Sequence, residues 1–258
     1  MQVDIIYSIT CHESPDSFAD TIENIKYFNR GHRIAIIVNA NPVMHRTIRE
    51  DDVVRLLPNP WNKRTCSHDI FTAHMQNYKY SQEKSITATY FIMLASNCMF
   101  HRQITLDEIE EGVSHAPPCD VKTLSRRGTD WHWPPFYKNA AIVSSLAENG
   151  IHTFIASEHE GMIIPYNIMS QIYTFVTSNR LIENIIQQTV FEEIFPGTLY
   201  AYFTGKKPYH ICKVFWEKPG CAPSIDDIRA CGDPCVKRVA RTMQNPVRQW
   251  LLSLRNSP

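Results

Sequence analysis

The opening of the chain alternates between strand-like and helix-like segments, and this order restricts the possible fold more than any other feature. Residues 3–10 (VDIIYSIT) and 33–38 (RIAIIV) are rich in β-branched side chains, so each predicts a buried strand. Between them, residues 15–29 start with a proline and an acid after Ser14, and apolar side chains recur at helical spacing. A strand, a helix and a second strand in this order imply a parallel, right-handed βαβ unit.

Later segments extend this pattern. Strands are expected at 53–57, 86–94 and 151–156, and helices at 69–81, 106–113, 165–177, 190–203 (interrupted by Pro196 and Gly197) and 246–255. We see no internal repeat or clear linker, and 258 residues suit one large α/β domain. The sequence therefore predicts a single domain, 1–258, with a mostly parallel sheet flanked by helices and an appended C-terminal part.

Composition excludes several classes of protein. The 26 basic and 26 acidic residues balance, which argues against a general nucleic-acid or membrane-surface binder. The apolar runs are too short for a transmembrane segment, and the N-terminus lacks the basic region of a signal peptide, so we expect a cytoplasmic protein. The eight cysteines should then be reduced. Cys221, Cys231 and Cys235 with His210 or Cys212 match no standard zinc spacing, and no metal is expected.

A group of cations near the C-terminus stands out against this neutral background. Lys237, Arg238, Arg241 and Arg248 lie within 12 residues. Such a cluster suits an anion with two or more phosphates, and the chain has neither an acidic Asp-x-Asp segment nor a Gly-rich phosphate loop. Positive side chains are therefore expected to take the place of a metal ion. The alternative is a solvated basic face of a helix.

Polar residues follow three of the expected strands. In sheets of this kind ligands bind at the carboxyl ends of the strands, which singles out residues 10–13, 39–41 and 95–98. Elsewhere, Glu158, Glu160, Glu192 and Glu193 are flanked by apolar and aromatic residues. Partial burial raises the proton affinity of a carboxylate and suits it to general-base catalysis, although most such glutamates are structural or on the surface.

Two tryptophans lie in a loop-rich stretch between residues 116 and 135. Trp131 and Trp133 flank His132 and are followed by two prolines. Aromatic faces stack on the apolar faces of sugar rings, so the loop is a candidate for binding a carbohydrate acceptor. The alternative is a loop that its tryptophans attach to the core.

Four segments, taken in order, resemble the core-2/I-branching β-1,6-N-acetylglucosaminyltransferase and peptide O-xylosyltransferase family. They are residues 9–12 (ITCH) with the following helix, 90–96 (YFIMLAS), 192–198 (EEIFPGT) and the basic segment 236–248. The resemblance spans most of the chain and depends on the order and spacing of the segments. It implies a GT-A-type nucleotide-sugar fold and an inverting, metal-independent transfer of a sugar, GlcNAc or xylose, from a UDP-sugar to a glycan acceptor.

The resemblance also implies a role for individual residues. Glu193 becomes the general base, and cations replace a divalent ion at the diphosphate. The resemblance assigns Lys237, Arg238 and Arg241 to the diphosphate. From the topology we expect the nucleotide to contact Thr10, His12, Asn39, Ser96 and Asn97, with Asn59, Lys63 and Arg64 beside them. The acceptor is expected to contact Trp131, Trp133 and Glu160. Residues 1–115 would form the nucleotide-binding half and 116–258 the acceptor-binding half with the basic segment. No cofactor and no nucleic-acid partner are expected.

The sequence departs from the family in two respects, and other functions stay open. The chain shows no membrane anchor, and Ser96-Asn97-Cys98 stands where many relatives have Gly and Asp nearby. A retaining, metal-dependent transferase would need an acidic pair at the strand end. A non-catalytic carbohydrate-binding protein would use Trp131 and Trp133. A glycoside hydrolase would use Glu160 and Glu193 as acid and base, and would leave the basic cluster unexplained.

Overall fold

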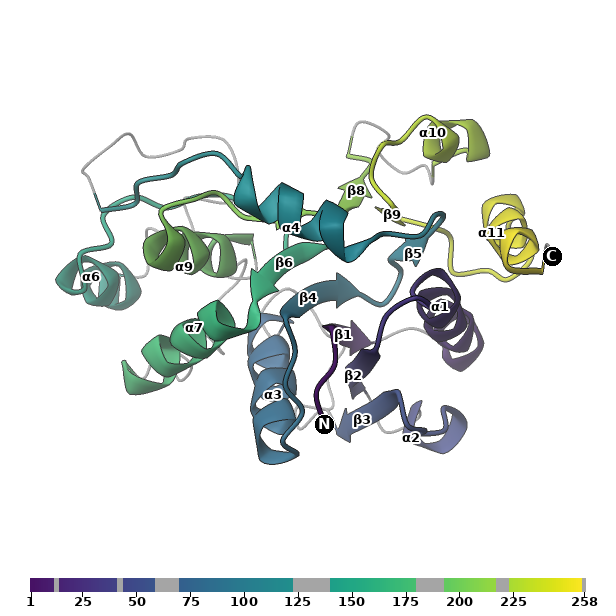
Figure 1. The fold of residues 1–258 in the computed structure, drawn as a ribbon, viewed down its shortest axis with the longest axis horizontal. Coiled ribbons are helices and arrows are strands. Elements are labelled where there is room, and N and C mark those ends of the chain that lie inside the picture. Colours follow the sequence, from purple (N-terminus) through teal and green to yellow (C-terminus); the bar gives the residue numbers. More distant parts are fainter. Residues whose placement is uncertain are drawn as a thin grey trace.

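The computed structural model describes residues 1–11, 14–40, 44–58, 70–122, 140–179, 193–216 and 223–256. At its centre lies a six-stranded sheet with the strand order β3-β2-β1-β4-β6-β7 (Figure 1). The strands are β1 (Ile5–Cys11), β2 (Ile34–Ala40), β3 (Val54–Pro58), β4 (Tyr90–Ala95), β6 (Met162–Pro165) and β7 (Tyr209–His210). The chain is therefore an α/β protein, as the sequence predicts, and β1 and β4 are the two central strands of the sheet.

The prediction of a mostly parallel sheet is wrong, because the sheet is mixed. Strands β3, β2, β1 and β4 run parallel, whereas β6 is antiparallel to β4 and β7 is antiparallel to β6. Two neighbouring strands can run parallel only if a crossover connection, usually a helix, returns the chain to the end of the sheet where the first strand began. Residues 151–159 before β6 are irregular and run along the carboxyl end of β4, where Gly161 N donates to Met93 O at 2.8 Å. The chain therefore enters β6 from that end and runs back.

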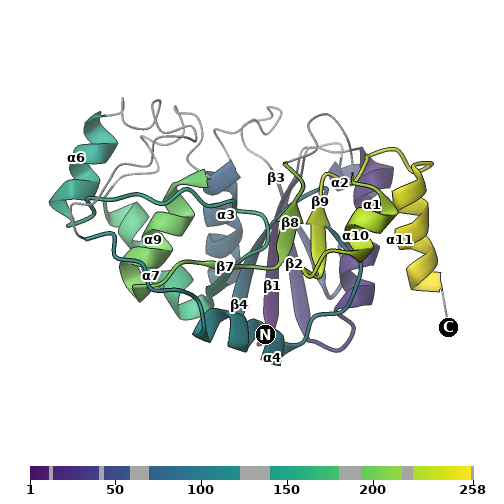
Figure 2. The same cartoon turned by 90° about the horizontal axis from the view of Figure 1, so that it is seen from above.

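Helices cover both faces of the sheet, as Figure 2 shows. The described helices are α1 (Pro15–Phe28), α2 (Met44–Thr47), α3 (Ile70–Glu83), α4 (Leu106–Ser114), α6 (Ala140–Glu148), α7 (Tyr166–Ser178), α9 (Phe195–Thr204), α10 (Ile225–Arg229) and α11 (Pro246–Asn256). Side chains of α3, α6, α7 and α9 pack with Ile6, Ile37 and Phe91, and those of α1 and α4 pack on the opposite face. None of these helices has both the length and the apolar composition that crossing a membrane requires.

A second, three-stranded sheet lies beside the carboxyl end of β4. Its order is β5-β9-β8, with β5 (Met99–Phe100), β8 (Cys212–Val214) and β9 (Cys235–Lys237). Cys235 N donates to Ile211 O at 3.1 Å. These strands, like β6 and β7, are two to four residues long and carry too little periodicity to be seen in the sequence. Conversely, the strand expected at 151–156 is irregular, and the helix expected at 190–203 begins only at Phe195.

The C-terminal helix α11 is held to α1 by charge. Arg248 and Arg255 both form ion pairs with Asp20, and Arg248 is only 1% exposed. Arg248 also donates from Nη1 to Ser17 O and from Nε to Ala240 O, each at 3.0 Å. One cation of the basic segment is thus a structural residue, buried at the contact between α1 and α11.

We predict that Arg248→Ala lowers the free energy of unfolding by about 3 kcal/mol, because it leaves a buried carboxylate with only one of its two counterions. Urea denaturation followed by circular dichroism measures the loss. The matched control is Lys79→Ala, which removes an exposed pair with Glu83 and should change the stability little. Equal losses in the two variants would contradict a special role for the pair at Asp20.

Candidate functional site

The carboxyl ends of the parallel strands bring together several residues that the sequence singles out. The strand register places Thr10 beside Asn39 on one side and Ala95 on the other. Thr10, Asn39 and Ser96 are nevertheless buried, and Asn39 Nδ2 donates to Gln76 Oε1 at 2.9 Å. The expected nucleotide contacts therefore lie at one edge, mostly with their side chains directed into the protein.

Other expected residues lie outside the part of the chain that the structure describes. They are His12, Asn59, Lys63, Arg64, Trp131, Trp133 and Glu192. The aromatic part of the predicted acceptor site and one flank of the predicted donor site therefore stay predictions. The described part of the site comes from residues 155–161, from the start of α9 and from β9.

Glu193 and Glu158 line the same cavity. This cavity has a volume of about 120 Å³, and Ala156 and Ser157 complete its described lining. The backbone joins the two segments, because Ser157 N donates to the carbonyl of Glu193 at 2.7 Å. Glu158 and Ser157 also line an adjacent pocket of about 410 Å³, together with Lys207 and other residues. Glu158 thus lines two neighbouring spaces, each large enough to admit part of a small ligand.

Gly197 explains how Glu193 reaches this position. The sequence places Pro196 and Gly197 where they seem to interrupt a helix, but proline in the first turn instead begins α9. A Cβ atom on Gly197 would lie 2.7 Å from the Cβ of Ser157, so only glycine allows α9 to pack so closely. Ile155 N donates to Thr198 Oγ1 at 3.1 Å and fixes the same contact. Glu193, two residues before the first residue of α9, is therefore held at the cavity.

Glu160 and Lys237 form a buried ion pair between the two sheets. The Glu160 side chain is 4% exposed and that of Lys237 is 20% exposed. Burial raises the pKa of Glu160, but His159 and the Lys237 ammonium lower it to about 2. Burial also lowers the pKa of His159, so Lys237 is the cation that keeps Glu160 ionised at neutral pH. This carboxylate is engaged with Lys237, which argues against the predicted contact with an acceptor.

Glu158 has the opposite environment. Burial is the main cause that raises the pKa of Glu158 to about 7; a hydrogen bond donated by Trp216 Nε1–H opposes this shift, and the nearby Glu160 adds to it. A carboxyl group with a pKa near neutrality can both accept and donate a proton under physiological conditions. The neighbouring His210 donates from Nε2–H to the carbonyl of Glu158 at 2.7 Å, and the same nitrogen lies 3.0 Å from Ser157 Oγ.

Arg238 and Trp216 form an exposed platform next to these carboxylates. The guanidinium carbon of Arg238 lies 4.3 Å from the Trp216 ring centroid, and 39% of Trp216 is exposed. Arg238 has φ = 73°, a left-handed conformation that is uncommon outside glycine, and its Nη1 donates to Phe215 O at 3.2 Å. Such backbone strain persists where the surrounding structure imposes it, often at functional sites. Sequence reasoning missed Trp216, although the stacking argument used for Trp131 applies equally to it.

The four cations of the basic segment do not form one patch. Lys237 pairs with Glu160, Arg238 stacks on Trp216, Arg241 is exposed, and Arg248 is buried against Asp20. The alternative of a solvated helix face is wrong, because Lys237 belongs to strand β9. Of the four, Lys237 and Arg238 lie with the carboxylates.

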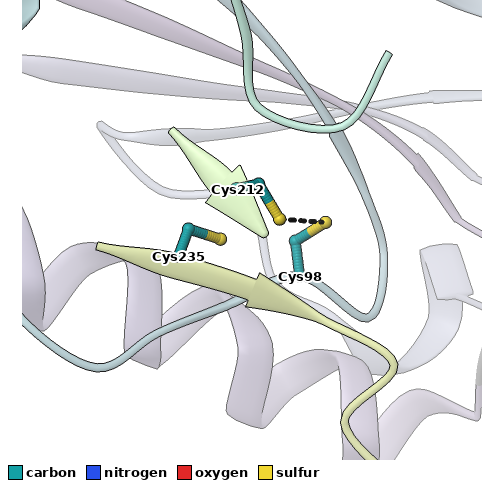
Figure 3. Close-up of side chains that lie close together, drawn as sticks. All are labelled: Cys98, Cys212 and Cys235. Atoms are coloured by element: carbon teal, nitrogen blue, oxygen red, sulfur yellow. Dashed lines mark hydrogen bonds between the residues drawn. The ribbon is translucent and has the colours of Figure 1, made fainter. Parts of the chain in front are cut away.

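The cysteines considered for zinc are arranged differently from the expectation. Cys221 lies outside the described residues, and Cys231 lies apart from the other sulfurs. Cys235 and Cys212 instead meet Cys98 in a buried cluster (Figure 3). Sequence spacing could not reveal this cluster, because Cys98 lies more than a hundred residues before its neighbours.

We predict that Glu158→Gln raises the free energy of unfolding by about 1 kcal/mol at pH 8 and leaves it unchanged at pH 5. This value is reduced to allow for screening of the partly exposed carboxylate by solvent. Glu158 ionises near 4.5 when unfolded and near 7 when folded, so its ionisation increasingly disfavours the folded state as the pH rises between these values. Urea denaturation at both pH values measures the effect.

Glu160→Gln provides the control of opposite sign. In the wild-type protein the lowered pKa of Glu160 contributes to the free energy of unfolding above pH 4.5, and this contribution is lost as the pH falls toward 2. At pH 8 the Gln variant should therefore have a free energy of unfolding lower by on the order of 3 kcal/mol. The same direction of change in both variants at pH 8 would contradict the contrast between the two environments.

The chain matches no protein-family model, and a search of curated proteins finds no significant sequence relative. What the protein does has therefore to be inferred from its residues and from the geometry of this site.

Proposed function

We propose that the protein is an inverting glycosyltransferase that moves a sugar from a UDP-sugar to a hydroxyl group of a glycan, with Glu193 as the general base. One observation supports the proposal: Glu193 and two of the cations that the resemblance selects, Lys237 and Arg238, lie around the same carboxyl group, that of Glu158. Glu193 shares a cavity with Glu158, and Glu158 is electrostatically coupled to Lys237. Arg238 and Trp216 lie beside them.

The reaction is a single displacement. The acceptor oxygen forms a bond to the anomeric carbon while the bond from that carbon to the UDP phosphate oxygen breaks. Glu193 takes the proton of the attacking hydroxyl group, and the configuration at the anomeric carbon inverts. No covalent intermediate with the protein forms, so one base and a stabilised leaving group are sufficient.

Arg238 is the main candidate for stabilising the leaving diphosphate. Its guanidinium can donate two parallel hydrogen bonds to phosphate oxygens, whereas Glu160 already neutralises much of the charge of Lys237. The exposed ring of Trp216 fixes the guanidinium from one side.

Glycoside hydrolysis is the second candidate function. It is favoured by the cavity that Glu158 and Glu193 share, because a carboxyl group with a raised pKa beside another carboxylate is the arrangement that such enzymes use. The pair that the sequence suggests, Glu160 with Glu193, is a poorer acid and base, since Glu160 is ionised and bound to Lys237. Hydrolysis leaves the platform of Arg238 and Trp216 without a role.

We predict that UDP is released from one member of a panel of UDP-sugars and that brief treatment with EDTA does not stop the release.

Glu193→Gln should lower turnover by about 10²- to 10⁴-fold, the usual contribution of a general base, with UDP affinity preserved. Coupled detection of UDP and calorimetric titration with UDP measure the two quantities. Normal turnover in Glu193→Gln with an inactive Glu158→Gln would move the base to Glu158. Cleavage of glycosides without any nucleotide would identify a hydrolase instead.

We also predict that Arg238→Ala weakens UDP binding by about tenfold or more, because a charge-assisted contact to phosphate is lost. Arg241→Ala is the matched control, since it removes an equal charge from an exposed position three residues further along. Calorimetric titration with UDP compares the two. Equal losses would indicate general electrostatic attraction, and no loss in Arg238→Ala would remove this residue from the diphosphate site.

A further inference from the structure

Three buried thiols lie together where the two sheets meet. Cys98 follows β4, Cys212 begins β8 and Cys235 begins β9. Their exposed fractions are 0%, 5% and 0%, respectively. All three sulfur atoms lie within 4.8 Å of one another, and those of Cys98 and Cys212 are 3.8 Å apart. Figure 3 shows the three side chains pointing into the same space.

The spacing of the sulfurs suits a bound metal ion. A tetrahedral site with metal–sulfur bonds of about 2.3 Å separates its sulfur ligands by about 3.8 Å. One pair already has this separation, and the third sulfur is at most 4.8 Å away, so small side-chain rotations would bring all three into contact with one ion. The three cysteines are contributed by separate segments, and the fold itself therefore assembles the site.

The bound ion itself balances most of the charge of coordinated thiolates, which release their protons to solvent on binding. The ammonium group of Lys237, two residues after Cys235 in β9, also interacts with Cys98 and Cys212, although Glu160 neutralises much of its charge.

We propose that Cys98, Cys212 and Cys235 bind one soft, closed-shell metal ion, Zn²⁺ or Cu(I), in a structural site. Thiolate ligands select such ions over hard cations. All three ligands are buried, so an ion bound by them is shielded from solvent and from substrates. The ion joins the turn after β4 to β8 and β9, and so holds the strand that carries Lys237 against the main sheet.

Metal content and stability test the proposal without any activity measurement, so its outcome does not depend on the proposed transferase. Protein purified with reductant under anaerobic conditions is stripped with a chelator and titrated separately with Zn²⁺ and with Cu(I), against a chromophoric competitor for each. We expect one equivalent of one of these ions to bind, with a rise in the thermal midpoint. X-ray absorption of the loaded wild-type protein should show three sulfur ligands, a measurement that needs no variant.

Cys98→Ala should abolish binding, whereas Cys231→Ser, which alters a half-buried cysteine outside the cluster, should bind normally. Circular dichroism checks that both variants fold. Failure of the reduced wild-type protein to bind either ion would overturn the proposal, as would coordination by fewer than three sulfurs or undiminished binding by a folded Cys98→Ala variant.

Discussion

The buried ion pair between Glu160 and Lys237 is the interaction on which the arrangement of the site depends. It connects the segment before β6 in the main sheet to β9 in the small sheet. A buried pair contributes little net stability, but loss of either partner leaves a charge without compensation in a poorly solvated place. Separation of the two sheets would therefore have a large cost in free energy. Both charges of this pair act on the neighbouring Glu158, whose pKa Glu160 raises and Lys237 lowers, and Arg238 directly follows Lys237 in the chain.

Three carboxylates at one edge of the sheet have different environments. Glu160 is ionised and structural, Glu158 titrates near neutral pH, and Glu193 lies at the shared cavity just before α9. Environments that separate the proton affinities of neighbouring acids are a common way to give similar side chains different tasks. In the proposed transferase the charge of Glu160 is neutralised by Lys237, and Glu193 is the carboxylate that contacts the acceptor.

Local sequence patterns could predict the first βαβ unit and most helices, because long buried segments show clear periodicity. They could not predict the direction of β6, which depends on where the preceding irregular segment runs. Nor could they separate Glu160 from Glu193, since burial and the ion pair with Lys237 are tertiary properties. The same limit explains why Trp216 was missed: its contacts with Glu158 and Arg238 arise only in the folded chain.

The charge contacts at Asp20 have a consequence for how the chain is made. Asp20 is separated from Arg248 by 228 positions and from Arg255 by 235. Helix α1 leaves the ribosome long before its counterions are synthesised, and strand β9 of the site also emerges late. Contacts between such distant positions close slowly. A nascent chain therefore carries an unneutralised acid on α1 until residue 248 has been made, and translation products that stop before that residue should expose this helix to the proteases and chaperones of the cell.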